Sequence, residues 1–439
     1  MSPKKPKTNV GIVRKPSRGK AKKRRVGKGP KYPRQPEPER PKRYASNRRP
    51  LSHIKGAERH DGDPRSAETL AKAFRVLPED RDLPTEGIHA VHPYPARFHP
   101  AWAKALLNEL SPDAVVLDPF CGSGTVLAEA SLSGRQSYGA DVNGVAVRIA
   151  RLRTTRRDEE FLEDVARTAL RVFEQAAQHR DSPFGALAVD NKAFAPHVMT
   201  QLINLRDAIA HVRDPDVREV LLLCLTPLLG KFGSKPNKTA PEVSRHAVRD
   251  HFLMRSEKVV LALADFANAV PEHLPDPEIK EMDARNLQWP RGIADAVITS
   301  PPYPGVYHYA LEQRLAARWM APAGLSRDVL KKAWTKEMGR RGARPGSWIG
   351  AMGPVLRGLS RIVRPGGRLF LVIGDGVETD EPVFIDDQLG ALLAEQSMPL
   401  RFVAAVSQER PHFHEPTAWL FEGRPRREHL IELERTRDL

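Results

Sequence analysis

Short apolar runs rich in β-branched residues alternate with helical stretches in two separate parts of the chain. Each run has the length of a buried strand and is bounded by turn residues. The strands are predicted at 115–117, 136–140, 294–298 and 368–373, and helices at 125–132, 351–363 and 385–396. A strand followed by a helix and a second strand implies a parallel pair with a right-handed connection. The pattern therefore predicts an α/β fold with a doubly wound, mostly parallel sheet.

The middle of the chain has a different rhythm. Between 151 and 280 apolar residues recur every three or four positions, as in Phe161, Val165 and Ala169, which is typical of amphipathic helices. Two later apolar runs, at 400–406 and 417–421, predict an antiparallel hairpin at the edge of the sheet. The expected organisation is a core of residues 61–150 and 281–425, a helical insertion at 151–280 and a C-terminal tail at 426–439.

The positive charge is concentrated at the N-terminus. The chain carries a net charge of +16, but residues 1–60 alone hold 21 Lys and Arg and three Glu, so the remaining residues carry −2. Because this arm has too few apolar residues to offset its ordering entropy, we expect it to be disordered. It could serve as a solubilising tail, as an arm that attracts nucleic acid or as a nuclear-import signal.

Composition narrows the class of protein further. Cys121 and Cys224 are the two cysteines of the sequence, too few for a disulfide framework, and we expect a reducing interior. No apolar run reaches the length that spans a bilayer, and we expect a cytoplasmic, nucleoid-associated protein without a membrane partner. His89, His92 and His99 lack helical i,i+4 spacing and a nearby cysteine, so we expect no metal site.

The stretch from Asp118 to Thr125 joins the first strand to its helix. Gly122 and Gly124 allow positive φ and close approach of the backbone to a ligand. The spacing differs from dinucleotide-binding turns, and the Lys of a triphosphate-binding loop is missing. Asp141 ends the next strand, 19 residues after Gly122, near the offset of a carboxylate that accepts ribose hydroxyls. The turn therefore predicts an adenosine-type ligand without a polyphosphate.

A second stretch, Ser300-Pro301-Pro302-Tyr303, follows the strand at 294–298. Two prolines stiffen this loop and remove backbone donors, so it offers hydrogen-bond acceptors. Ser300 Oγ and the Pro301 carbonyl can each accept from an NH₂ group, and the Tyr303 ring can stack on a base. Both stretches end parallel strands, where α/β sheets bind their ligands.

Together the two stretches resemble the DNA amino-methyltransferases, the S-adenosylmethionine-dependent enzymes that methylate cytosine N4 or adenine N6. The resemblance covers residues 88–150 and 280–421 and implies a class I, Rossmann-like methyltransferase fold. It implies that Ser300, Pro301, Pro302 and Tyr303 are catalytic. It also implies that the S-adenosylmethionine contacts are Arg97, Phe98, Asp118, Pro119, Phe120, Cys121, Gly122, Ser123, Gly124, Thr125, Asp141, Asp283 and Ala284.

The target of methylation depends on one residue. Ser300, where relatives carry Asp or Asn, favours cytosine N4 over adenine N6 within the family. Adenine N6, guanine N2 of RNA and a non-catalytic basic DNA-binding protein are the alternatives. Carbon-5 methylation needs a cysteine nucleophile after proline, whereas Cys121 follows Phe120. The expected partner is double-stranded DNA with its target base flipped out, contacted by the insertion, and the oligomeric state is not predicted.

Overall fold

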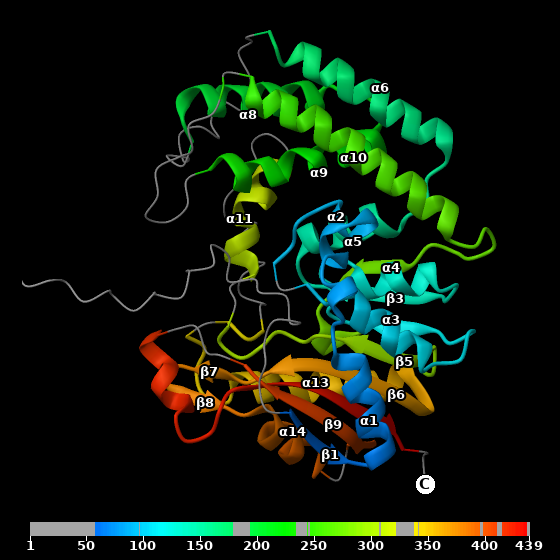
Figure 1. Cartoon of the computed structure of the whole chain (residues 1–439), viewed down its shortest axis with the longest axis vertical. Coiled ribbons are helices and arrows are strands. Elements are labelled where there is room, and N and C mark those ends of the chain that lie inside the picture. Colours follow the sequence, from blue (N-terminus) through cyan, green and yellow to red (C-terminus); the bar gives the residue numbers. More distant parts are fainter. Residues whose placement is uncertain are drawn as a thin grey trace, which may run out of the picture. The chain divides into compact units, whose positions relative to one another are not determined.

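The computed structural model describes residues 58–95, 97–178, 194–233, 244, 246–306, 309–321, 338–340, 342–395, 398–410 and 415–436. Within these residues a mixed sheet has the strand order β1-β9-β10-β6-β5-β2-β3-β4 (Figure 1). Strands β6, β5, β2, β3 and β4 run parallel to one another, and β10, β9 and β1 pair antiparallel. This order confirms the predicted doubly wound sheet with an antiparallel part.

The middle strands of the sheet are apolar, whereas the strands near its edges contain more polar residues. Their bounds are β1 (Glu58–Gly62), β2 (Val116–Asp118), β3 (Ser137–Asp141), β4 (Glu278–Glu281), β5 (Ala294–Thr299), β6 (Val363–Gly374), β9 (Leu400–Glu409) and β10 (Arg427–Arg435). A separate two-stranded sheet pairs β7 (Gly376–Glu378) with β8 (Glu381–Val383). The middle strands β2 and β5 are buried on both faces, which explains their continuous apolar sequence.

Helices cover both faces of the sheet. They are α1 (Pro64–Phe74), α2 (Gly87–Ala90), α3 (Pro100–Asn108), α4 (Thr125–Leu132), α5 (Gly144–Thr154), α13 (Ser347–Ile362) and α14 (Ile385–Leu393). Because neighbouring strand residues point to opposite faces, Val116 and Ile298 pack in the cluster of α1 and α3, whereas Leu117 and Val297 pack in that of α13 and α14. The two cores hold the sheet rigid beneath the strand ends.

The helical insertion has its own core. It contains α6 (Glu159–Gln175), α8 (Pro196–Ala210), α9 (Pro215–Phe232) and α10 (Ala247–Ala269), which Figure 1 shows as neighbouring helices. Asp158 and Asp214 cap α6 and α9 by accepting backbone N–H groups of the first turn. The later helix α11 (Tyr309–Met320) also packs against α9. The described part of residues 151–280 is thus mostly helical, and α5 runs past residue 150 to Thr154.

The prediction for the end of the chain is wrong. Residues 417–421 lie in a 3₁₀ helix, Glu415–Phe421, and the partner of β9 is β10 in the segment expected to be a tail. β10 lies between β6 and β9, so it is not at the edge. The sequence pattern did not predict β10 because charged residues interrupt its apolar residues. Glu428 and Glu432 are only 9% and 4% exposed, and they pair with Arg410 and Arg368.

The opposite end of the sheet also differs from the prediction. β1 begins at Glu58, so the last residues of the expected basic arm form an edge strand paired with β9. The rest of the arm lies outside the described residues. β4, a short and mostly polar strand, carries no apolar run that the sequence pattern could reveal. No helix among the described residues combines the length and the apolarity needed to cross a membrane.

Candidate active site

The two predicted motifs meet at the ends of neighbouring strands. β2 and β5 pair in parallel, with Val116 opposite Ala296, so Asp118 and Thr299 end the strands side by side. Thr299 Oγ1 donates a 2.6 Å hydrogen bond to Asp118 Oδ1, and the same oxygen accepts from the Phe120 backbone N–H at 3.1 Å. Motifs 181 residues apart are thus joined by one buried bond.

Two glycines shape the turn after β2. Gly122 and Gly124 have φ of 50° and 80°, the left-handed region that favours glycine. A Cβ on Gly124 would lie 2.9 Å from Ala150 Cβ in α5, so the helix and the turn approach too closely for any side chain. The Cys121 N–H donates to the Ala140 carbonyl at 2.8 Å, which ties the turn to β3.

Asp141, at the end of β3, holds the turn from the other side. Its two carboxylate oxygens accept N–H groups from Gly122 at 3.0 Å and Asn143 at 2.8 Å. Burial raises the pKa of Asp141 to about 6, and the two N–H donors oppose that rise. Each oxygen keeps a further lone pair, so the carboxylate can also accept ligand hydroxyls. The donor and acceptor set therefore fits a ribose.

A pocket lies between the turn and the catalytic loop. Its lining residues are Tyr94, Arg97, Phe98, Asp118, Phe120, Cys121, Gly122, Ser123, Thr125 and Ser300. Most residues predicted for the cofactor, together with the first catalytic residue, therefore surround one space. The cavity has a volume of about 30 Å³, room for about one water. An adenosine-sized ligand therefore requires rim side chains such as Tyr94 to move on binding.

Asp118 has the most perturbed carboxyl group of the pocket. Burial raises the pKa of Asp118 to about 7, with a smaller contribution from the negative charge of Asp141. The hydrogen bonds from Thr299 and Phe120 act in the opposite direction. The neighbouring Cys121 thiol is also buried, and its pKa is raised well above its usual value, so it is a poor nucleophile.

Five predicted cofactor residues lie outside this lining, namely Pro119, Gly124, Asp141, Asp283 and Ala284. Asp283 follows β4, where the Met282 N–H donates to the Asp141 carbonyl at 3.0 Å. Both Asp283 oxygens accept from Arg285, at 2.9 Å from Nε and 2.6 Å from Nη2. Ala284 is buried in the hydrophobic core. Asp283 therefore lies just after β4, beside the end of β3 that carries Asp141. A ligand amine would have to share the Asp283 carboxylate with Arg285.

The loop 300–303, which is predicted to be catalytic, is anchored at several points. The Tyr303 hydroxyl donates to Glu428 Oε1 at 2.7 Å, and Trp348 Nε1 donates to the Pro302 carbonyl at 2.9 Å. A Cβ on Gly374 would lie 2.8 Å from the Tyr303 ring, so the ring rests directly on β6. These contacts leave the Tyr303 ring in one fixed orientation. Sequence reasoning missed Glu428 because it lies in the segment taken for a tail.

Arg153 is a second residue that the sequence did not reveal. Its side chain is fully buried in α5 and donates to the Ser123 carbonyl and Oγ at 2.9 and 2.8 Å. It also donates to the carbonyls of His89 and His92 at 3.0 and 2.6 Å. Burial lowers the pKa of Arg153 to about 9. One guanidinium thus joins the cofactor turn to the segment that carries Tyr94.

The three histidines before α3 have separate partners. His89 Nε2 pairs with Glu129 at 2.7 Å, and His92 Nε2 lies 2.9 Å from Thr226 Oγ1 of α9. His99 caps α3, because its Nδ1 accepts from the Ala101 N–H at 3.2 Å. Burial lowers the pKa of His92 to about 3 and that of His99 to about 4. Each ring is thus a structural, uncharged group at neutral pH.

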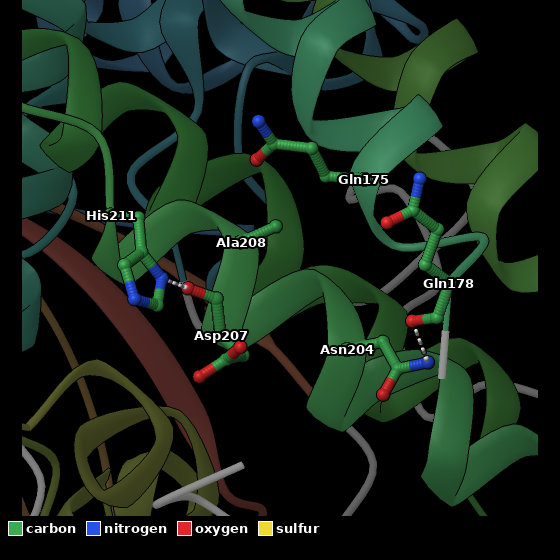
Figure 2. Close-up of a pocket in the computed structure, with 6 residues that line it drawn as sticks. All are labelled: Gln175, Gln178, Asn204, Asp207, Ala208 and His211. Atoms are coloured by element: carbon green, nitrogen blue, oxygen red, sulfur yellow. Dashed lines mark hydrogen bonds between the residues drawn. The ribbon is translucent and has the colours of Figure 1, made fainter. Parts of the chain in front are cut away.

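A different pocket lies in the insertion, at the end of α6 and along α8. Figure 2 shows its lining, which consists of Gln175, Gln178, Asn204, Asp207, Ala208 and His211. Asn204 Nδ2 donates to the Gln178 carbonyl at 3.4 Å, and His211 Nδ1 to the Asp207 carbonyl at 2.8 Å (Figure 2). Helical periodicity marks only buried faces, so the sequence carried no signal for this polar pocket.

The sheet and the site define a class I methyltransferase fold. Residues 4–152 match the family of N6/N4 methyltransferases described as DNA methylase. The match covers about a third of the chain and supports the predicted resemblance to the DNA amino-methyltransferases. S-adenosylmethionine is the methyl donor of this family.

Two curated relatives are similar to parts of the chain. One is the Type II methyltransferase M.MvaI of Kocuria varians, 24% identical over 53% of this chain and 57% of its own length. The other is the Type II methyltransferase M.MjaII of Methanocaldococcus jannaschii, 30% identical over 21% of this chain and 17% of its own. The chain thus spans between about a sixth and just over half of these relatives.

Solved structures add little to this picture. A SAM-dependent methyltransferase from Methanosarcina mazei covers 79% of this chain and all of its own, with 11% identity and a TM-score of 0.30. A similarity at this level carries no argument about the site.

Proposed function

We propose that this chain is a DNA methyltransferase that transfers the methyl group of S-adenosylmethionine to an exocyclic base amine, cytosine N4. The observation that carries the proposal is the hydrogen bond between Thr299 and Asp118. It places Ser300, the first residue of the catalytic loop, in the same pocket wall as the cofactor turn. A methyl donor and an amine must lie within reach of each other for direct transfer.

The cofactor turn supplies the groups that an adenosine-type donor needs. Asp141 offers acceptors for ribose hydroxyls, and the glycine turn lets the backbone approach the ligand. Arg97 and Phe98 come from the segment before α3 and complete the wall. S-adenosylmethionine bound here supplies an electrophilic methyl group. The buried and weakly acidic Cys121 takes no covalent part.

The catalytic loop positions the amine. Ser300 Oγ and the Pro301 carbonyl accept its two N–H groups, which directs the nitrogen toward the cofactor turn. The Tyr303 ring, held by Glu428 and by β6, provides a flat face for the base. The base must leave the duplex to reach this loop, at a cost of a few kcal/mol. Catalysis then rests on positioning, which is the main contribution of such preorganised acceptors.

Replacing Ser300 tests the proposal. Ser300→Ala removes one acceptor of the amine, and we expect the rate of methyl transfer to fall roughly 10- to 100-fold, as for loss of one strong hydrogen bond in the transition state. Binding of S-adenosylmethionine, measured by calorimetry, should stay close to that of the wild type. The matched control is Ser133→Ala, whose hydroxyl contacts only the Ala130 carbonyl at the end of α4. A full rate in Ser300→Ala would rule out this role.

The preference for cytosine rests on Ser300 and needs a direct readout. Single-turnover assays on duplexes that carry only cytosine or only adenine as a candidate amine separate the two bases. We expect methylation of the cytosine duplex alone. Methylation of adenine would reassign the base without changing the site.

A further inference from the structure

A basic groove lies along residues 87–93, which precede Tyr94, Arg97 and Phe98 of the pocket predicted for the cofactor. The groove is lined by Gly87, Ala90, Val91, Pro93, Pro227, Leu228, Lys231, His251, Met254, Arg255, Lys258 and Val259. Its volume is about 370 Å³, so it is far larger than the cofactor cavity. These residues come from α2 and the loop after it, from the end of α9 and from α10. We define this feature as the basic groove.

The charges of the basic groove have one sign. Lys231, Arg255 and Lys258 line it, and no Asp or Glu does. Among the described residues none of these three forms an ion pair, and Lys231 lies only over the Phe232 ring. The two lysines are exposed. Three uncompensated cations around one depression create a site for an anionic ligand.

Arg255 fixes the charge at the base of the groove. Its Nη2 donates to the Val91 carbonyl at 2.6 Å, and its Nε is buried without a partner in the described part of the chain. Burial lowers the pKa of Arg255. An anion near this guanidinium would satisfy a donor that the fold leaves unpaired.

Apart from His251, the other side chains of the lining are apolar. Val91, Leu228 and Val259 are buried, whereas Met254 is 43% exposed. A small inorganic anion would use the cations and leave this surface wet. A phosphodiester backbone presents anionic oxygens together with the apolar face of each deoxyribose, and it matches both parts of the lining.

The position of the groove links it to the active site. Ala90, Val91 and Pro93 form one of its walls, while Tyr94, Arg97 and Phe98 of the same segment line the cofactor pocket. Arg153 and Arg255 hold this segment through its carbonyls. A nucleic-acid backbone in the groove would therefore contact the same segment of the chain that lines the cofactor pocket.

We propose that the basic groove binds the phosphodiester backbone of the DNA substrate, with Lys231 and Lys258 on successive phosphates. This inference rests on the proposed function for the identity of the polymer. The groove positions the duplex and carries no sequence information, because backbone contacts fix orientation and not base choice.

The test compares two double variants of the full chain. Lys231→Gln with Lys258→Gln removes both charges of the groove, and Lys72→Gln with Lys104→Gln removes two exposed charges of α1 and α3. Dissociation constants for one duplex are measured at salt concentrations from about 50 to about 200 mM, the range in which DNA affinity falls steeply with salt. We expect the groove variant to lower the salt slope by about two and the control to leave it unchanged, since each phosphate contact contributes about 0.9.

The outcomes separate this inference from the proposed function. Equal salt slopes for the groove variant and the wild type would overturn the groove as a DNA contact, even if methyl transfer occurs. A reduced slope in a protein that methylates no DNA would keep the groove and reject the proposed function. Competition by polyglutamate that depends on Lys231 and Lys258, with DNA binding unaffected by the same variant, would assign the groove to an acidic protein partner and overturn the proposal. Melting temperatures of both variants confirm folding.

Discussion

Asp118 joins the two motifs of the site, because its carboxylate accepts a hydrogen bond from Thr299. Its pKa is raised from 3.8 to about 7, so between these values the folded protein holds a proton that the unfolded chain has released. The free energy of unfolding must therefore fall as pH rises through this window, and it is insensitive to this group below and above it. Asp141, with a pKa raised to about 6, acts in the same direction.

Replacing Asp118 by Asn isolates its share of this pH dependence. The amide oxygen can still accept from Thr299 and Phe120, but the side chain no longer titrates. Between pH 5 and 8 the wild type should lose more unfolding free energy than Asp118→Asn, by on the order of 2 kcal/mol. Urea unfolding at both pH values measures the difference. Parallel losses in the two proteins would contradict the raised pKa.

Arg153 offers a prediction about stability at the same scale. Arg153→Met removes the Arg153 donor from the carbonyls of His92 and Ser123, whereas the His89 carbonyl keeps a hydrogen bond from Arg97 Nη1 at 2.6 Å. An unsatisfied buried acceptor costs about 1–3 kcal/mol, so the free energy of unfolding should fall by about 3 kcal/mol or more. Affinity for S-adenosylmethionine should fall too, because Ser123 lines the pocket. Arg167→Met, an exposed change on α6, is the control, and equal unfolding midpoints for the two variants would be the contrary result.

Among the secondary-structure elements, the spacing of apolar residues predicted some strands and helices and missed others. The middle strands and the helices of the insertion were predicted because buried faces leave apolar residues at fixed spacing. β10 was missed because it lies between two other strands yet carries Glu428 and Glu432, whose charges are paired inside the fold with Arg410 and Arg368. The two motifs lie at the ends of neighbouring strands, and their roles in binding and catalysis stay predictions. Arg153, Trp348 and Glu428 could not be assigned, because their partners are set by tertiary packing and not by spacing.

The position of β10 makes truncation informative. A chain ending at residue 425 loses the strand that pairs with both β6 and β9, so we expect an insoluble or unfolded product. A chain ending at residue 436 keeps all of β10 and should fold like the full chain. Circular dichroism and thermal melting of the two products distinguish them. A folded chain lacking 426–439 would contradict the sheet order.

At the scale of the whole molecule, charge is divided between an N-terminal arm and a nearly neutral body. We expect the arm to add sequence-independent DNA affinity that falls steeply with salt. The deletion that tests this must end at residue 57, because β1 begins at Glu58 and pairs with β9. Removing 1–57 should flatten the salt dependence of DNA binding. An unchanged slope, measured by fluorescence anisotropy, would show that the arm makes no phosphate contact.

The proposed active site should give one chemical product. Wild-type protein and Ser300→Ala are each incubated with duplex DNA, RNA and S-adenosylmethionine, and the nucleic acids are digested to nucleosides for mass spectrometry. We expect N4-methylcytosine in DNA treated with the wild type, and strongly reduced amounts of N4-methylcytosine in DNA treated with Ser300→Ala. Unmethylated DNA, or a methylated guanine found in RNA alone, would contradict the central claim that the pocket between Asp118 and Ser300 methylates a DNA base amine.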